Sequence, residues 1–230
     1  MIPNQQIALN QQYQQGCNLG QQGMVAESTG NVPMAIQLYD QSIAWIWGSI
    51  VQARQLGLFV PAHIPFALAV SHFAAARMKF AAGWLPASSA HLGAAIEALN
   101  QAITINPGVA QFHALAGNIL AIQGNWPWAE QALQRAVQLN PNDAWSQWML
   151  AWIHSAQGNM VAANQYYGSA VQGNPGMPGL PQTFAGLFGA QGGGGQGSQP
   201  HGVMDVLNTL KPFAELVNNV FGAFNTGWSE

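Results

Sequence analysis

Acid–base and metal-binding side chains are present in this chain, but they are not grouped at catalytic spacing. The sequence holds six histidines and eight carboxylates. No histidine stands in a His-Glu-x-x-His motif or in another tight spacing that would hold a metal ion. The carboxylates are dispersed, without the close pair that general acid–base catalysis uses. We therefore expect no enzyme, no metal and no cofactor, and we interpret His113 and His154 as hydrogen-bonded structural histidines.

Two further features offer chemistry at first sight. Gly192–Gly195 is glycine-rich, but no Lys-Ser or Lys-Thr follows and no strand precedes it, so it is a linker and not a phosphate-binding loop. Cys17 is the single cysteine, which rules out an internal disulfide framework and a cysteine-based metal site. A small buried side chain is the favoured interpretation of Cys17, and an intermolecular disulfide is the alternative.

Charge excludes whole classes of partner. Charged residues make up 6% of the chain, against about 25% in ordinary soluble domains. A net charge of −3 from five basic and eight acidic residues gives no electrostatic footprint for nucleic acid or for an anionic membrane surface. A surface with so few charges resists self-association poorly, which favours close packing against other proteins.

Apolar stripes are the more informative binding chemistry. Trp145, Trp148 and Trp152 are spaced i, i+3 and i+7, so a helix would carry them on one face. They either pack against a capping helix or the next unit, or line an apolar groove for an amphipathic helix. A second stripe recurs at spacings of three and four within 201–225 and needs an apolar partner. Its members include Val206, Leu210, Phe213, Val217, Phe221 and Phe224.

A fixed period organises the elements that must position these stripes. Pro107, Pro141 and Pro175 each follow an Asn and recur at a constant interval (141 − 107 = 34 and 175 − 141 = 34). Gly124 and Gly158 repeat the same interval (158 − 124 = 34). Such a period is typical of a helical repeat, in which each unit buries its apolar face on its neighbours. Glycine permits the positive φ that ends one helix, and Asn-Pro stops the next.

The pattern resembles the tetratricopeptide repeat (TPR) family. Residues 110–143 and 144–177 match it best, residues 76–109 match more loosely with Ala90 at the inter-helix glycine position, and Gly30–Ala35 is a divergent or elongated copy. The resemblance implies an all-α fold, a short right-handed TPR-like helical solenoid, and the apolar spacing within 201–225 adds a C-terminal amphipathic helix. The best matches rest on Gly117, Gly124, Ala129, Leu133, Ala136 and Pro141, then on Leu150, Ala151, Gly158, Ala163, Tyr167, Ala170 and Pro175.

The resemblance also implies a concave face lined by the first helix of each unit, where many family members hold a peptide or a helix. Family members that clamp a carboxylate use Lys, Arg and Asn there, and only Arg77 and Asn118 remain in this chain, so we do not expect that activity. By the family's register the partner-binding positions are Arg77, Phe80, Trp84, Gln111, Ala114, Asn118, Trp145, Trp148 and Trp152.

Residues 59–85 are apolar almost all round. Prolines and charges shorten the apolar core of this stretch below the ~20 residues that a bilayer needs, so a central packed helix is favoured over a membrane span.

Four segments are expected along the chain. The segments are a Gln-rich start at 1–15 (disordered, or an extension of the first helix), a TPR-like helical repeat domain at 16–177, a Gly/Pro-rich linker at 178–200 and an amphipathic helix at 201–230. Helices are expected near 10–28, 33–55, 59–85, 87–105, 109–123, 126–139, 143–157 and 159–172.

These observations favour a non-enzymatic protein-interaction and self-assembly module. We expect a structural subunit or scaffold of a filament or other extended homo-oligomer, with the C-terminal helix docked on a neighbouring solenoid. The alternative is an adaptor or chaperone that binds an apolar segment of another protein. No nucleic acid partner and no membrane span are expected. The start lacks the features of a signal peptide, so a cytoplasmic protein is the default and a leaderless or processed extracellular assembly the alternative.

Overall fold

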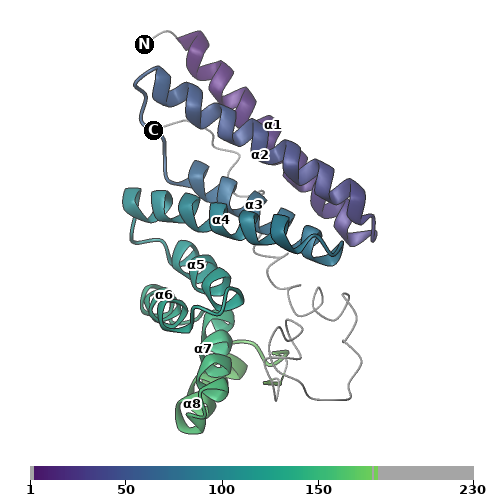
Figure 1. Ribbon diagram of the computed structural model, residues 1–230. Coiled ribbons are helices and arrows are strands. Elements are labelled where there is room, and N and C mark those ends of the chain that lie inside the picture. The colour runs from purple at the N-terminus through teal and green to yellow at the C-terminus, as the bar shows by residue number, and fades with distance from the viewer. Residues whose placement is uncertain (1–2, 178, 181–230) are drawn as a thin grey trace. The chain divides into compact units, whose positions relative to one another are not determined.

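The computed structural model describes residues 3–177 and 179–180, and the regular elements in these residues are all α-helices (Figure 1). This confirms the all-α fold class. The helices fall into two compact units, α1–α4 and α5–α8, and each is described by itself. The expected C-terminal helix lies outside the described residues. The helices are α1 (Pro3–Ser28), α2 (Val32–Gln55), α3 (His63–Ala81), α4 (Leu85–Ile105), α5 (Ala110–Ile122), α6 (Trp126–Leu139), α7 (Ala144–Ala156) and α8 (Met160–Gly173).

Glycine turns end the first helix of each hairpin. Gly124 has a φ of 76°, its N–H donates to the Ala121 carbonyl at 3.0 Å, and the Asn125 N–H donates to the Leu120 carbonyl at 2.9 Å. This pair of bonds satisfies carbonyls that the end of α5 would otherwise leave open, and a side chain at the glycine would be strained. Pro127 then falls in the first turn of α6, where a missing N–H does no harm.

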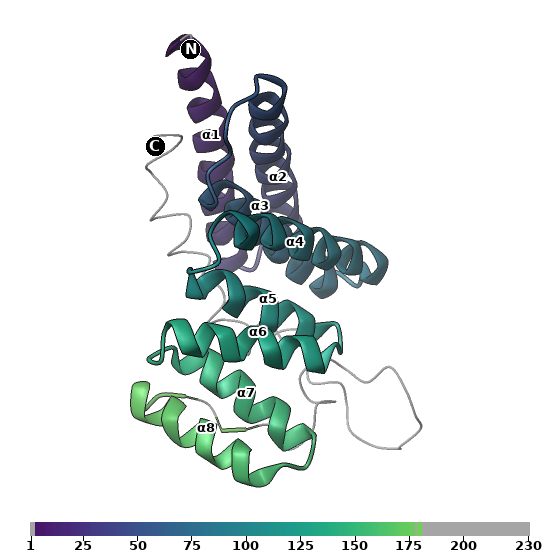
Figure 2. The same ribbon diagram turned by 90° about the vertical axis from the view of Figure 1, so that its left-hand side faces the viewer.

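The first unit is a pair of helical hairpins. In both views α1 runs beside α2 and α3 beside α4, and α2 also packs against α3 (Figures 1 and 2). Because α1 begins at Pro3, the Gln-rich start extends the first helix and is not a separate segment. From Ile64 to Lys79, α3 is buried except for the half-buried His72, which explains its apolar sequence. No helix among the described residues is long and apolar enough to cross a bilayer.

The second unit repeats one hairpin at the sequence period. The starts of α5 and α7 are separated by one period (144 − 110 = 34), and so are those of α6 and α8 (160 − 126 = 34).

Close contact between paired helices depends on a small residue. A Cβ added to Gly117 of α5 would lie 2.6 Å from Leu133 Cγ and 3.1 Å from the Ala129 carbonyl oxygen, both on α6. Glycine at this position is therefore a packing requirement.

The predicted boundaries of the third repeat, 76–109, are wrong. Ala90 does not occupy an inter-helix turn, because it lies inside α4. The turn is seven residues earlier (90 − 83), at Gly83, which has a φ of 78°. The physical reason is the length of α4, which has 21 residues where α6 has 14, so counting back one period from Pro107 ends within a helix.

Candidate functional site

A side-chain cap fixes the start of α7, the helix that carries the three tryptophans. The Asp143 carboxylate accepts the N–H of Trp145 at 3.2 Å, the N–H of Ser146 at 3.3 Å and the Ser146 hydroxyl at 2.6 Å. These bonds satisfy donors that the first helical turn leaves without a partner inside the helix. The three predicted tryptophans consequently follow at the helical spacing that the sequence indicated.

The structure buries two of these tryptophans. Trp148 and Trp152 are 2% and 1% exposed, and Trp145 is half-buried. The ring centroids of Trp152 and of Trp126 on α6 are 5.3 Å apart. The ring centroids of Trp148 and Trp145 are 5.9 Å apart, and these two rings meet edge-on. Neither Trp148 nor Trp152 is open to a partner in this arrangement. Their assignment to partner binding stays a prediction.

The other predicted positions lie in different surroundings. Arg77 and Phe80 belong to the last turns of α3, and the 55% exposed Trp84 is the N-cap residue of α4. These positions do not line the middle of a first helix, because the repeat boundaries from which they were counted are wrong. On α5, Gln111 is exposed and Asn118 is buried. The remaining predicted positions lie outside the described residues, and these are Val206, Leu210, Phe213, Val217, Phe221 and Phe224.

Arg77 is the centre of a buried polar contact that joins three helices. Its Nη2 donates to Oε1 of Glu27 on α1, and the Tyr39 hydroxyl on α2 donates to Oε2 of the same carboxylate at 2.9 Å. Arg77 is 4% exposed, so this charge pair is held away from water. Burial, and then the Glu27 charge, raise the pKa of Tyr39 well above its ordinary value. Tyr39 therefore stays protonated and remains a donor.

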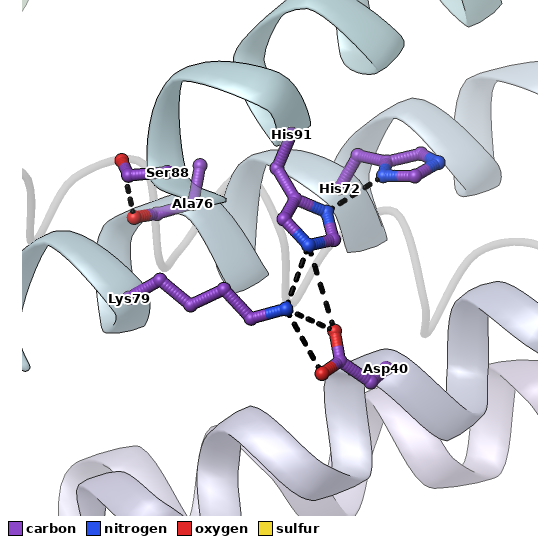
Figure 3. A network of polar contacts seen from close by, with 6 residues as sticks. All are labelled: Asp40, His72, Ala76, Lys79, Ser88 and His91. Atoms are coloured by element: carbon purple, nitrogen blue, oxygen red, sulfur yellow. Dashed lines mark hydrogen bonds and ion pairs between the residues drawn. The ribbon is translucent and has the colours of Figure 1, made fainter. Parts of the chain in front are cut away.

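A second cluster, the Lys79 network, consists of Asp40 on α2, His72 and Lys79 on α3, and His91 on α4 (Figure 3). Lys79 Nζ donates to both oxygens of Asp40, at 2.8 and 2.9 Å, and lies 2.7 Å from His91 Nε2. The Nδ1 atoms of His91 and His72 are 2.9 Å apart. One buried ammonium thus connects three helices, and Figure 3 shows the two rings extending the connection back to α3.

The hydrogen bonds of the Lys79 network fix where its protons are. An ammonium can only donate, so His91 Nε2 must accept and carries no proton. His91 therefore holds its proton on Nδ1 and donates it to His72 Nδ1, which leaves both imidazoles neutral. Burial, and then the neighbouring His91, lower the pKa of His72 to about 4. Burial, and then the Lys79 charge, also lower the pKa of His91, whereas Asp40 acts in the opposite direction.

Sequence spacing could not reveal this network. Lys79 and Asp40 are 39 residues apart, and Lys79 and His91 are 12 apart. The available signal was the composition of α3, an apolar helix interrupted by His72, Arg77 and Lys79. Ionisable residues are almost never fully buried unless they are paired, so each interruption pointed to a partner on another helix.

The chemistry that these groups support is proton exchange and helix attachment. Within the described part of the chain, no group of three or more His, Cys, Asp or Glu side chains is placed to hold a metal ion. The polar atoms of the Lys79 network face one another, and Ser88 of α4 adds a bond from its hydroxyl to the Ala76 carbonyl at 2.8 Å (Figure 3). The network is therefore a polar attachment between helices.

Comparison with known proteins identifies the repeat. The family model described as tetratricopeptide repeat matches residues 110–143, which contain the α5–α6 hairpin. No curated protein matches the chain. Solved structures that are similar include MamA from AMB-1, at 13% identity over 71% of this chain and 93% of that chain, with a TM-score of 0.47. TTC0263 of Thermus thermophilus is 18% identical over 70% of this chain and 92% of that one, with a TM-score of 0.41. PilF of Pseudomonas aeruginosa is 17% identical over 97% of this chain and 79% of that chain, with a TM-score of 0.47.

The matched hairpin and the structure agree on the kind of protein. The second hairpin of the same unit, α7–α8, repeats the bounds of the matched one after a single period (144 − 110 = 34). Both hairpins carry the glycine turn and the small residues that the sequence pattern required. Tetratricopeptide repeats are protein-interaction modules, and the fold suggests that role for this chain. The α5–α6 hairpin is a tetratricopeptide repeat, and the α7–α8 hairpin repeats its form.

Proposed function

We propose that this chain is a self-assembling interaction subunit, in which the C-terminal apolar stripe docks on α7 of a neighbouring copy. The stripe is the set of apolar residues between Val206 and Phe224 that recur at spacings of three and four. Docking between copies would make the protein a structural subunit of a filament or another extended homo-oligomer. The burial of α7 is the observation that supports this function best.

Every residue of α7 from Ser146 to His154 is buried. Successive residues of a helix point about 100° apart, so an unbroken buried run covers all sides of it. The described helices that pack against α7 are α8, α6 and, to a small extent, α5. The α7–α8 hairpin is the last one that the structure describes, and the last unit of a repeat array needs an added cover for its apolar face. The C-terminal stripe is the part of the sequence that suits this role.

Exchange of such a cover between copies would produce assembly without any new surface. The linker at 178–200 is rich in Gly and Pro, and a flexible linker of that length spans about 25–30 Å root-mean-square. A cover that can dock on its own unit can then also dock on the same face of a neighbour. Because this contact joins two different surfaces, it propagates into a ring or a filament. A chain with only five basic and eight acidic residues offers little charge repulsion against this contact.

The test compares the full chain with a truncation that ends at Gly197, by sedimentation and electron microscopy at micromolar concentration. We expect rings or fibres from the full chain and small species from the truncation. Val217→Asp puts a charge into the stripe and should abolish assembly. Asn218→Asp is the matched control, because it adds the same charge to the polar side and should leave assembly unchanged.

Two results would overturn the proposal. If the full chain is a monomer at every concentration, the stripe does not connect copies. If the truncation assembles as well as the full chain, another surface is responsible. In the first case the adaptor alternative gains support, and it predicts that the chain stays monomeric until an apolar segment of another protein is added.

A further inference from the structure

Helix α4 buries the apolar residues Ala95, Ala98, Leu99 and Ala102, and a small set of polar contacts adds to its attachment to the rest of the first unit. Among the described residues these include the Lys79–His91 and His72–His91 bonds, the bond from Ser88 to the Ala76 carbonyl, and an exposed bond from Arg54 to Gln101 at 2.7 Å. The first two share one imidazole, that of His91, which is the centre of the connection in Figure 3. A change in the protonation of this ring therefore affects two contacts at once.

We propose that the Lys79 network is a proton-sensitive attachment, in which protonation of His72 or His91 breaks its hydrogen bonds and loosens α4 from α3. The proposal concerns the first unit alone. It is independent of the assembly proposed above, because it uses no residue of α7 or of the C-terminal stripe.

Each ring can accept a proton only at an atom that already serves as an acceptor. On His72 that atom is Nδ1, and a proton there would face the Nδ1–H of His91 at 2.9 Å. On His91 it is Nε2, and a proton there would face the Lys79 ammonium at 2.7 Å. Both cases replace an attractive contact by two opposed donors, and in the second case by two opposed positive charges.

The groups that face these rings do not compensate for the added charge. On α2 the facing group is Asp40, whose Oδ1 is 3.7 Å from His91 Nε2, and Lys79 already bonds both of its oxygens. On α3 the charged group that faces His91 is Lys79, and His72 faces both Lys79 and the His91 imidazole of α4. Each of these neighbours opposes a further positive charge on the ring that it faces. A proton bound to the closed network would therefore give Asp40 two cations to neutralise.

The direction of the pH dependence follows from the proton affinities of the closed and open states. The pKa of His72 is about 4 in the closed network, against an ordinary value of 6.5. An open state that restores the ordinary value binds more protons between those limits, so acidification favours opening and alkaline pH favours closure. For His72 alone, the opening equilibrium should rise roughly 30-fold between pH 7.5 and pH 5.

Hydrogen exchange of the full chain at pH 7.5 and pH 5, corrected for the intrinsic exchange rate, tests this proposal. We expect α4 to lose protection by roughly 30-fold or more at pH 5. Helix α6 is the internal reference and should change little. The double variant His72→Asn, His91→Gln keeps short polar acceptors but cannot titrate, so α4 should lose its pH response. His113→Gln on α5 removes a histidine outside the network, and it should leave the response of α4 intact.

The native chain alone can overturn the proposal, even if the double variant does not fold. Equal protection of α4 at both pH values, after correction, would exclude a proton-sensitive attachment. A response shared equally by α4 and α6 would assign the effect to the whole chain. In a folded double variant, a response of α4 that matches the native one would assign it to other groups. The single variant His72→Asn, which keeps the Lys79–His91 bond, should show a reduced response.

Discussion

Arg77 carries its charge between three helices, where water does not reach it. Arg77→Met would leave the Glu27 carboxylate, whose side chain is 15% exposed, without its cation. Removing one partner of a buried pair costs about 3–5 kcal/mol of folding free energy, because the other charge stays buried. We expect a loss of about 3 kcal/mol in urea unfolding followed by circular dichroism.

The matched control for this change is Arg135→Met on α6. Arg135 is exposed and makes a single long bond to Gln138 at 3.4 Å, so its removal should change stability by less than about 0.5 kcal/mol. Glu27→Gln combined with Arg77→Met should recover part of the loss, because it removes the uncompensated charge. Equal losses of unfolding free energy from the two arginine substitutions would show that the contact between Arg77 and Glu27 does not stabilise the fold.

The residues of the candidate sites were only partly predictable. Trp148 and Trp152 were recognised as a stripe because helical spacing is written in the sequence. The partners of Arg77 and Lys79 were not recognised, because Glu27 and Asp40 are 50 and 39 residues away along the chain. Spacing reports which residues share a helix, whereas a contact between helices depends on how the helices pack.

At the scale of the helix, small residues decide how closely a hairpin closes. Gly117→Ala would place its Cβ 2.6 Å from Leu133 Cγ, so α5 and α6 would have to move apart. Overpacking of this kind typically costs about 1–3 kcal/mol, which thermal unfolding would measure as a lower Tm.

Gly168→Ala on α8 is the matched control for Gly117→Ala. A Cβ at Gly168 meets nothing within 4 Å, so only the helix propensity changes there. We expect Gly168→Ala to stabilise the chain by about 0.5–1 kcal/mol. If Gly117→Ala is also stabilising, then close approach is not what the glycine provides.

The bounds of the helices were predictable where the residues that end each helix recur at a constant interval. They were misplaced where these residues do not recur at that interval. From Ala110 to Gly173 the glycine turns and Asn-Pro ends recur at a constant interval, and the predicted and observed bounds agree within one residue or so. The α3–α4 hairpin departs from the interval because α4 has 21 residues. Nothing in the period indicates this extra length.

At the scale of the whole molecule, the low number of charges determines how assembly should respond to salt. The proposed contact is apolar, and the chain has five basic and eight acidic residues. Screening should therefore remove little attraction or repulsion. We expect the sedimentation of the full chain to be nearly the same in 50 mM and 500 mM NaCl. Dissociation at high salt would indicate a contact held by ion pairs, contrary to the proposal.

The all-α architecture was predictable from the whole sequence, but the division into two units was not. The fold class follows from helical periodicity and from the turn residues that recur after each helix. The division after Pro107 is not marked by a change of composition, because the Asn-Pro at that point is the same as the one at Pro141. Because the same Asn-Pro pair ends helices inside a unit and at the edge of a unit, it does not reveal where one compact unit stops.

The equal offset of the two hairpins in the second unit has a consequence for how such a chain can lengthen. Since α7 begins one period after α5, and α8 one period after α6, residues 110–143 are a module with matching ends. A tandem duplication of that module would present a new α7-like helix to α6 and an unchanged surface to the old α7. Gene duplication in whole modules can thus extend this protein without redesigning either neighbour.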